Sequence, residues 1–286
     1  MRILLAGAGG QLGTTLKAAL APLGDVASFD HAALDLADAE ALVRVCRDVA
    51  PEVIVNAAAY TAVDRAESEP ALAHAVNARA PGILAGEARR LGALLVHYST
   101  DYVFDGAKRT PYVETDPVAP LGAYGASKLA GELAIAASGC AHLVLRTGWV
   151  YAPHGRNFLM TMLRLAETKE ELRVVDDQRG APTSCALLAR ETARLLALPQ
   201  ARSARGLYHL SAGGDVSWFG FARAIFERRS RGGHDVPRVT GITTSEYPTA
   251  ARRPAYSVLG NAKLAADFGW RQPPWEEGLD EALGSP

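Results

Sequence analysis

The stretch RILLAGAGGQLG (residues 2–13) determines how the chain begins to fold. A short, mostly apolar run at 2–6 is followed by a glycine-rich turn, and apolar residues recur at helical spacing over 11–21. Glycine allows a tight turn and a close approach to a pyrophosphate, while a helix N-terminus offers unpaired N–H groups and a positive dipole end. The stretch therefore predicts a dinucleotide site between a buried strand and a helix. Its glycines stand three apart, which departs from the GxGxxG form: Gly7, Gly10 and Gly13.

Strands and helices are expected to alternate through the first 150 residues. Further strands are expected at 25–30, 52–59, 93–100 and 142–147. Helices are expected at 38–49, with Asp38 as N-cap, at 71–91, and from Tyr124 onward. This alternation predicts an α/β fold with a doubly wound, Rossmann-like parallel sheet covered on both faces, and ligands in such sheets bind beyond the carboxyl ends of the strands.

After Trp149 the alternation becomes less regular. Helices are expected at 157–167, 185–198 and 218–229, with short strands at 172–175 and 207–210. We therefore expect a dinucleotide-binding domain at 1–150 and a smaller α/β substrate domain at 151–286. The two are expected to interleave, with the helix at 184–198 returning to the first.

Composition excludes several classes of protein. The chain has 286 residues, a formal net charge of −1 and 49% hydrophobic residues, so we expect neither a nucleic-acid partner nor a membrane anchor. The seven histidines show no metal-ligand spacing, and His97 is expected to be a packed strand residue. The three cysteines are far apart, which fits a reducing cytoplasm: Cys46, Cys140 and Cys185.

The stretch YGASKLAGE (residues 124–132) places Tyr124 one helical turn before Lys128. Residues four apart share a helix face, and a nearby ammonium lowers the pKa of a phenol from its usual value of about 10. The pair is therefore a candidate acid–base device, and its alternative is a solvated pair on a helix surface. Asp30, at the end of the second strand, is a candidate for the ribose 2′-OH, which favours NADH over NADPH; capping a loop is the equal alternative.

Seven motifs in order along nearly the whole chain resemble those of the extended short-chain dehydrogenase/reductases, and specifically the dTDP-4-dehydrorhamnose reductases. They are GAGGQLG, NAAAYTAVDRAESEP, STDYVFDG, YGASKLAGE, RTGWVY, DDQRGAPTS and YPTAARRPAYS. The first four are typical of the superfamily, and the last three are more specific to the reductases. The resemblance implies a cytoplasmic enzyme with NADPH or NADH as cofactor and a dTDP-sugar as substrate. Such an enzyme reduces the 4-keto group of dTDP-4-dehydro-6-deoxy-L-mannose to give dTDP-L-rhamnose, the last step of that synthesis.

The resemblance also implies roles for individual residues. Catalytic roles fall on Thr100 as carbonyl donor, Tyr124 as general acid, Lys128 as the cation that lowers its pKa, and Asn77 as support for a water relay. Tyr124 and Lys128 also bind the cofactor, together with Gly7, Gly10, Gln11, Leu12, Gly13, Asp30, Asp35, Leu36, Ala57, Ala58, Ala59 and Tyr98. Substrate contacts fall on Thr100, Asp101, Tyr102, Trp149, Asn157, Arg252 and Arg253.

Several alternatives stay open at this point. Asp35 can equally cap a helix, Trp149 can be interdomain core, and the arginine pair can be solvated. No metal site is expected, because the first helix carries no carboxylate over 14–17, and this makes a metal-bridged homodimer doubtful. The rival functions are another nucleotide-sugar reductase or epimerase and a regulatory subunit resembling that of methionine adenosyltransferase. A dehydratase is disfavoured because Tyr102, not a glutamate, follows Asp101.

Overall fold

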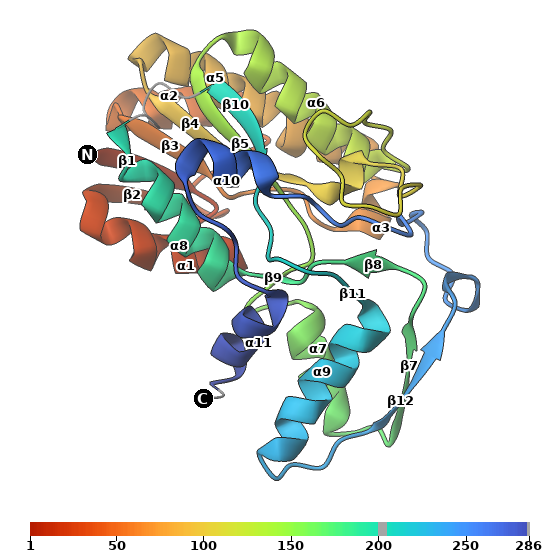
Figure 1. Cartoon of the computed structure of the whole chain (residues 1–286). Coiled ribbons are helices and arrows are strands. Elements are labelled where there is room, and N and C mark those ends of the chain that lie inside the picture. The colour runs from red at the N-terminus through yellow and green to blue at the C-terminus, as the bar shows by residue number, and fades with distance from the viewer. Residues whose placement is uncertain (200–204, 285–286) are drawn as a thin grey trace.

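A central sheet of six parallel strands organises the chain (Figure 1). The computed structural model describes residues 1–199 and 205–284. The strand order is β10-β5-β4-β3-β1-β2, which confirms the doubly wound α/β fold expected from the alternating pattern. The strands are β1 (Arg2–Ala6), β2 (Asp25–Phe29), β3 (Val53–Asn56), β4 (Leu94–Thr100), β5 (Ala141–Thr147) and β10 (Arg205–His209).

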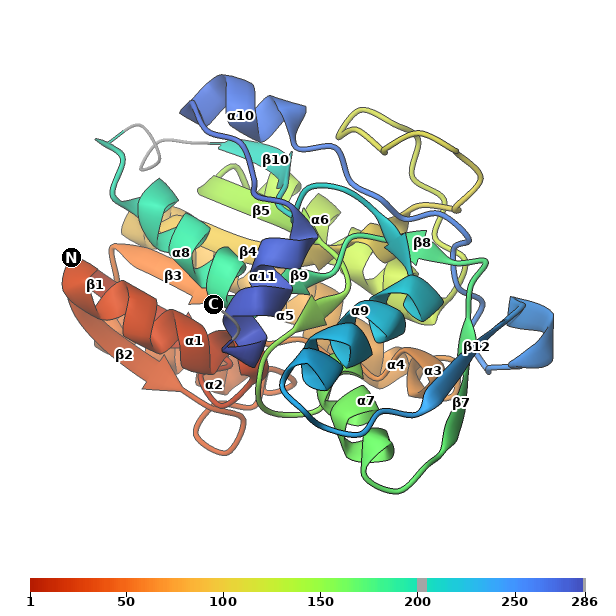
Figure 2. The same cartoon turned by 60° about the horizontal axis from the view of Figure 1, so that its bottom comes forward.

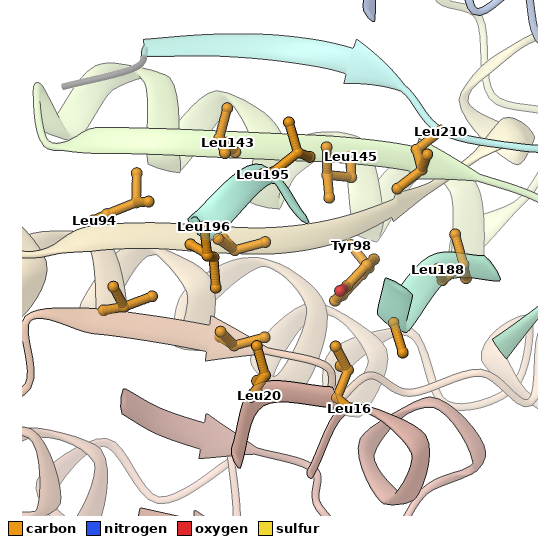
Figure 3. Packing of buried hydrophobic residues seen from close by; sticks show 14 of the residues in the cluster. Leu16, Leu20, Leu94, Tyr98, Leu143, Leu145, Leu188, Leu195, Leu196 and Leu210 are labelled. Carbon is orange, nitrogen blue, oxygen red and sulfur yellow. The ribbon is translucent and has the colours of Figure 1, made fainter. Parts of the chain in front are cut away.

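Each face of this sheet buries its own apolar core, because successive strand residues point to opposite faces. In β1, Ile3 and Leu5 join the core shown in Figure 3, whereas Leu4 and Ala6 join the other. The first core is covered by α1 (Gln11–Leu20) and α8 (Cys185–Leu196). The second is covered by α2 (Ala39–Val49), α5 (Ala80–Leu91) and α6 (Ala123–Ser138).

Some expectations from the sequence differ from the fold. The strand expected at 207–210 was assigned to the second domain, but it lies in β10 and pairs in parallel with β5. Residues 71–91 do form one helical run, but a π-helical turn, η2 (Ala75–Arg79), separates α4 (Pro70–His74) from α5. The strand expected at 52–59 stops at Asn56, so the three alanines that follow lie in a loop.

Much of the chain after residue 149 packs around a third apolar core beside the carboxyl ends of the sheet strands (Figures 1 and 2). Three two-stranded sheets pair β6 with β9, β7 with β12 and β8 with β11. These strands are β6 (Val150–Tyr151), β7 (Glu171–Val175), β8 (Arg179–Gly180), β9 (Thr183–Ser184), β11 (Val216–Ser217) and β12 (Arg238–Ile242). The helices of this core are α7 (Phe158–Ala166), α9 (Trp218–Arg231) and α11 (Trp275–Leu283).

Within the described ranges, the remaining short elements are α3 (Val63–Ala66), α10 (Ala262–Phe268), η1 (Ala21–Leu23), η3 (Asp101–Val103) and η5 (Thr244–Glu246). None of the helices in the described ranges is long and apolar enough to cross a membrane. All three cysteines are free thiols in the interior.

Candidate active site

The glycine loop between β1 and α1 brings three segments into close contact. Gly7 has a φ of +84°, and a Cβ there would lie 2.6 Å from the amide nitrogen of Ala58. A Cβ on Gly13 would lie 1.9 Å from the carbonyl oxygen of Gly7. Gly10 is the N-cap of α1 and supplies no side-chain cap to the helix. The first N–H groups of α1, from Gln11 to Gly13, therefore stay available for an anion, so this cradle fits a dinucleotide pyrophosphate.

At the expected adenosine end, the acidic side chains already accept hydrogen bonds from backbone N–H groups. The Asp30 carboxylate accepts a hydrogen bond from the Ala33 N–H at 2.9 Å, and the Asp35 carboxylate accepts one from the Ala37 N–H at 2.9 Å. Both carboxylates are exposed, so a ribose hydroxyl can still reach a second lone pair. The side chain of Leu36 is buried in the apolar core, so only its backbone remains for a ligand.

The loop that follows β3 lies against the glycine loop. The Ala57 N–H continues the sheet by donating to the Ala6 carbonyl at 3.0 Å, and the Ala58 N–H donates to the Asn56 side-chain oxygen at 3.2 Å. The side chains of Ala57, Ala58 and Ala59 are all half-buried. Small residues here leave the backbone beside the cradle open to a flat ligand.

Tyr124 lies in the first turn of α6, beside Thr100 at the end of β4. Gly125 lets α6 approach, because a Cβ there would lie 2.2 Å from the Tyr102 carbonyl oxygen. Burial raises the pKa of Tyr124 to about 12, the hydrogen bond between the Tyr124 and Thr100 hydroxyls partly offsets this, and the Asp101 charge adds to it. Within the described residues Lys128 does not shift this pKa, so the expected lowering of the Tyr124 pKa by Lys128 is not found.

Asp101 is a buried carboxyl group next to this pair. Thr100 Oγ1 donates to Asp101 Oδ1 at 3.1 Å and accepts from the Tyr102 N–H at 3.1 Å. Burial raises the pKa of Asp101 to about 6, and hydrogen bonds from Ser257 and Thr100 limit the rise. The single hydroxyl proton of Thr100 thus points at Asp101, and it has to rotate before it can be donated to a substrate.

Lys128 is buried under the end of β4. Its Nζ lies 2.6 Å from the Tyr98 carbonyl oxygen and 3.1 Å from His97 Nε2. Burial lowers the pKa of Lys128 to about 8, with Glu132 acting in the opposite direction. The Tyr98 phenol points to the opposite face of the sheet, where it contacts Thr192 of α8 and packs among leucines (Figure 3). Tyr98 therefore serves the site through its carbonyl, and its ring belongs to the core.

Asn77 lies in the π-helical turn and is fully buried. Its Oδ1 accepts from the Tyr60 N–H at 2.8 Å, and its Nδ2 donates to the Tyr60 carbonyl and to Ser127 Oγ, each at 3.0 Å. A Cβ at Gly131 would lie 2.2 Å from the Asn77 carbonyl oxygen, so α6 packs directly on this turn. The amide therefore clamps the Tyr60 loop to the helix of Tyr124, and its support of a water relay stays a prediction.

The expected sugar contacts divide into two groups. Arg252 lines a small recess together with Tyr102 and Tyr124, and the rings of the two tyrosines meet edge to face at 5.8 Å. Arg253 instead forms an ion pair with Asp64 of α3 at 2.8 Å, so its guanidinium ties the loop before residue 254 to the first half of the chain.

Trp149 and Asn157 have mainly structural contacts. Trp149 has a φ of +51° and stacks on Trp218 at 3.4 Å between ring centroids, as in the interdomain alternative. Asn157 caps α7 by accepting from the Met160 N–H at 2.9 Å, and its Nδ2 donates to Gln11 Oε1 at 2.6 Å. Gln11 is the first residue of α1, so Asn157 joins the glycine loop to the third core.

Residues 1–285 match the family model described as the RmlD substrate binding domain. The chain belongs to this family. It is 50% identical to a protein named dTDP-4-dehydrorhamnose reductase from Burkholderia thailandensis, over 284 residues that cover 96% of this chain and 95% of the relative. A protein of the same name from Escherichia coli K12 is 44% identical over 290 residues, covering 99% and 97% of the two chains.

A solved structure of the same fold is 38% identical, with a TM-score of 0.93 over 99% of this chain and 98% of the other. Its title describes a dTDP-4-dehydrorhamnose reductase from Bacillus anthracis in complex with NADP. In this member of the RmlD family, no group of three or more His, Cys, Asp or Glu side chains suits a metal ion within residues 1–199 and 205–284. The absence of a metal site therefore stays a prediction.

Sequence reasoning missed two polar groups beside Lys128 in this family member. His97 contacts its Nζ, and Asn56 Nδ2 lies 3.1 Å from His97 Nδ1. Strand alternation was the available signal, because Tyr98 and His97 are neighbours in β4 and so face opposite sides. His97 therefore shares a face with α6, whereas the ring of Tyr98 faces α8.

Proposed function

We propose that this chain reduces the 4-keto group of dTDP-4-dehydro-6-deoxy-L-mannose to give dTDP-L-rhamnose, with NADPH or NADH as reductant. The full-length family match and relatives at 40–50% identity that bear the name dTDP-4-dehydrorhamnose reductase support this. The observation that carries the proposal for this chain is the meeting of Thr100, Tyr124 and Lys128 at the carboxyl end of β4, in the sheet whose first loop forms the glycine cradle.

The chemistry assigns one task to each polar group. The reduced nicotinamide supplies a hydride to the ketone carbon. Tyr124 gives its hydroxyl proton to the ketone oxygen as that oxygen becomes an alkoxide, and its raised pKa keeps the phenol protonated at neutral pH until that moment. Thr100 turns its hydroxyl from Asp101 to the same oxygen, where negative charge develops. Lys128 orients the cofactor ribose and restores the proton.

Further assignments follow from the positions of the residues. We assign the pyrophosphate to the start of α1 and the adenosine ribose to Asp30. The part of the chain around the third core, together with Arg252, is proposed to close over the dTDP-sugar, and Tyr102 is proposed to face the sugar. The domain division near residue 150 belongs to this proposal, with β10 and α8 assigned to the cofactor half. A homodimer and a cytoplasmic location are also proposed, and the latter agrees with three free thiols.

The test is oxidation of NADPH and NADH by the purified chain with enzymatically prepared dTDP-4-dehydro-6-deoxy-L-mannose. Tyr124→Phe should lower turnover about 10²- to 10⁴-fold, because the proton donor is removed. Calorimetric titration should show that NADPH affinity is kept in this variant. Tyr247→Phe, the same change at an exposed tyrosine with no assigned role, is the matched control. Near-full turnover in Tyr124→Phe would remove Tyr124 as the acid, and no turnover in the unmodified chain would refute the proposed reaction.

A further inference from the structure

A row of buried polar groups runs from the loop after β3 to the lysine of the site. It consists of the Ala58 N–H, the side chain of Asn56, the ring of His97 and Nζ of Lys128, and the successive contacts measure 3.2, 3.1 and 3.1 Å. Asn56, His97 and Lys128 are 1%, 1% and 2% exposed. Water therefore hardly reaches these groups, and each donor needs an acceptor inside the protein.

The backbone fixes the direction of this row. A backbone N–H can only donate, so the Ala58 N–H requires the oxygen of the Asn56 amide. The amide nitrogen then faces His97 Nδ1 and donates to it. His97 Nδ1 is therefore the acceptor nitrogen of a neutral ring, and the ring proton lies on Nε2.

This tautomer of His97 determines which protonation state of Lys128 fits the row. A His97 Nε2–H that points at Nζ needs a lone pair there, which an amine has and an ammonium lacks. The second contact of Nζ, to the Tyr98 carbonyl, suits either form because Nζ donates in both. The hydrogen-bond directions of the row are therefore satisfied by neutral Lys128.

We propose that His97 is a positioning residue for Lys128, held by Asn56 in the tautomer whose Nε2–H donates to the Lys128 amine. Protonation of Lys128 then requires the row to reverse. The ring proton leaves Nε2 and a proton binds Nδ1, the Asn56 amide turns its oxygen toward Nδ1–H, and the hydrogen bond from the Ala58 N–H is lost. The charge of Lys128 is thereby coupled to the loop beside the glycine cradle. The coupling itself does not depend on the proposed function, but any role of it in catalysis does.

The surrounding charges agree with this arrangement. Burial holds the pKa of His97 well below its usual range and an ammonium at Lys128 lowers it further, so the ring is neutral with Lys128 in either form. Burial also lowers the pKa of Lys128 to about 8. Glu132, one turn further along α6, is the acidic group that acts on Lys128, but its carboxylate is already paired with Arg146 of β5 at 2.6 Å. Tyr124, one turn earlier, is a neutral phenol. Within the described residues, no anion free of other partners holds Lys128 in its charged form.

The test is nuclear magnetic resonance of the whole chain labelled with ¹⁵N-histidine and ¹³C-lysine, without cofactor or substrate. The chain has seven histidines and five lysines, and His97→Gln and Lys128→Met identify the two signals. Above the pH at which Lys128 titrates, His97 should carry its proton on Nε2. The proton should move to Nδ1 as Lys128 is protonated, with the same midpoint. A tautomer that stays constant across that titration, or a charged ring, overturns the inference.

Asn56→Asp reverses the row by design. A carboxylate accepts from both the Ala58 N–H and His97 Nδ1–H, so Nε2 becomes an acceptor for the ammonium. The ring should then keep Nδ1–H throughout, and Lys128 should bind its proton at least about tenfold more tightly. Asn77→Asp buries a carboxylate whose hydrogen-bond neighbours are Tyr60 and Ser127, outside the row, and should leave the coupled change in place. If the coupled change is lost in both variants, the added negative charge and not the hydrogen bonds of Asn56 explains the loss, and the inference is overturned. Because no turnover is measured, this outcome is independent of the test with Tyr124→Phe.

Discussion

Asp101→Asn should stabilise the fold at neutral pH. The folded-state pKa of Asp101 is raised from 3.8 to about 6, mainly by burial. The folded chain therefore binds the proton more tightly than the unfolded chain. The stabilisation is complete below about pH 4 and is lost as the pH rises through about 6. Asparagine resembles the protonated acid in shape and charge: its oxygen can accept from Thr100, and its nitrogen can donate to Ser257.

The size of the effect follows from the two pKa values. The difference between 3.8 and about 6 corresponds to about 3 kcal/mol once both states are ionised. Asp101→Asn should therefore raise the free energy of unfolding by about 3 kcal/mol at pH 7.5 and by only about 1 kcal/mol at pH 4.5. Urea unfolding followed by tryptophan fluorescence at both pH values measures this difference.

Asp105→Asn is the matched control, on the same loop and with the opposite sign. The Ala107 N–H and the Tyr112 hydroxyl lower the pKa of Asp105, so its contribution is present at neutral pH and is lost on acidification. This variant should be less stable than the unmodified chain at pH 7.5, and the difference should shrink at pH 4.5. If Asp101→Asn has the same effect at both pH values, or destabilises the fold at pH 7.5, then burial does not raise the pKa of Asp101 as argued.

Two further predictions concern packing and charge. Gly13→Ala should weaken NADPH binding and lower the free energy of unfolding by about 1–3 kcal/mol, because its Cβ meets Gly7. Gly86→Ala, on an open face of α5, should instead raise the free energy of unfolding by about 0.5–1 kcal/mol. Calorimetry measures the binding and urea unfolding the stability, and equal effects of the two variants would contradict the close approach at Gly13. Arg146→Met should lower the free energy of unfolding, measured in urea, by about 3–5 kcal/mol, because the buried Glu132 carboxylate loses its cation. Adding Glu132→Leu should recover most of this loss. If the double variant is as unstable as Arg146→Met, the ion pair itself stabilises the fold and the reasoning is wrong.

The sequence was sufficient for the sheet because each central strand is a short apolar run between turns. Asp38 was also predictable as an N-cap, and its side chain accepts from the N–H groups of Glu40 and Ala41. β10 was assigned to the wrong region because its short run resembles the other short strands after residue 150. Its partner, β5, is decided by long-range packing that local pattern does not contain.

The site was predictable in its location more than in its contacts. The four-residue spacing placed Tyr124 and Lys128 on one helix, but helix spacing does not determine where an ammonium turns once β4 offers a carbonyl and an imidazole. The pairing of Arg253 with Asp64 joins residues 189 apart, so no local pattern indicates it. Strand alternation would have assigned the ring of Tyr98 to the core, and that information was present in the sequence.

Trp149 shows a conflict between backbone and side chain. A φ of +51° is a conformation in which glycine rests without strain and a tryptophan does not. The ring nevertheless lies flat on Trp218, and Gly180 leaves room for it, since a Cβ there would come within 2.3 Å of the indole. Glycine would relieve the backbone at this position, but it would also remove the indole that stacks on α9. One ring therefore fastens the segment after β5 to α9 at the cost of an unfavourable backbone angle.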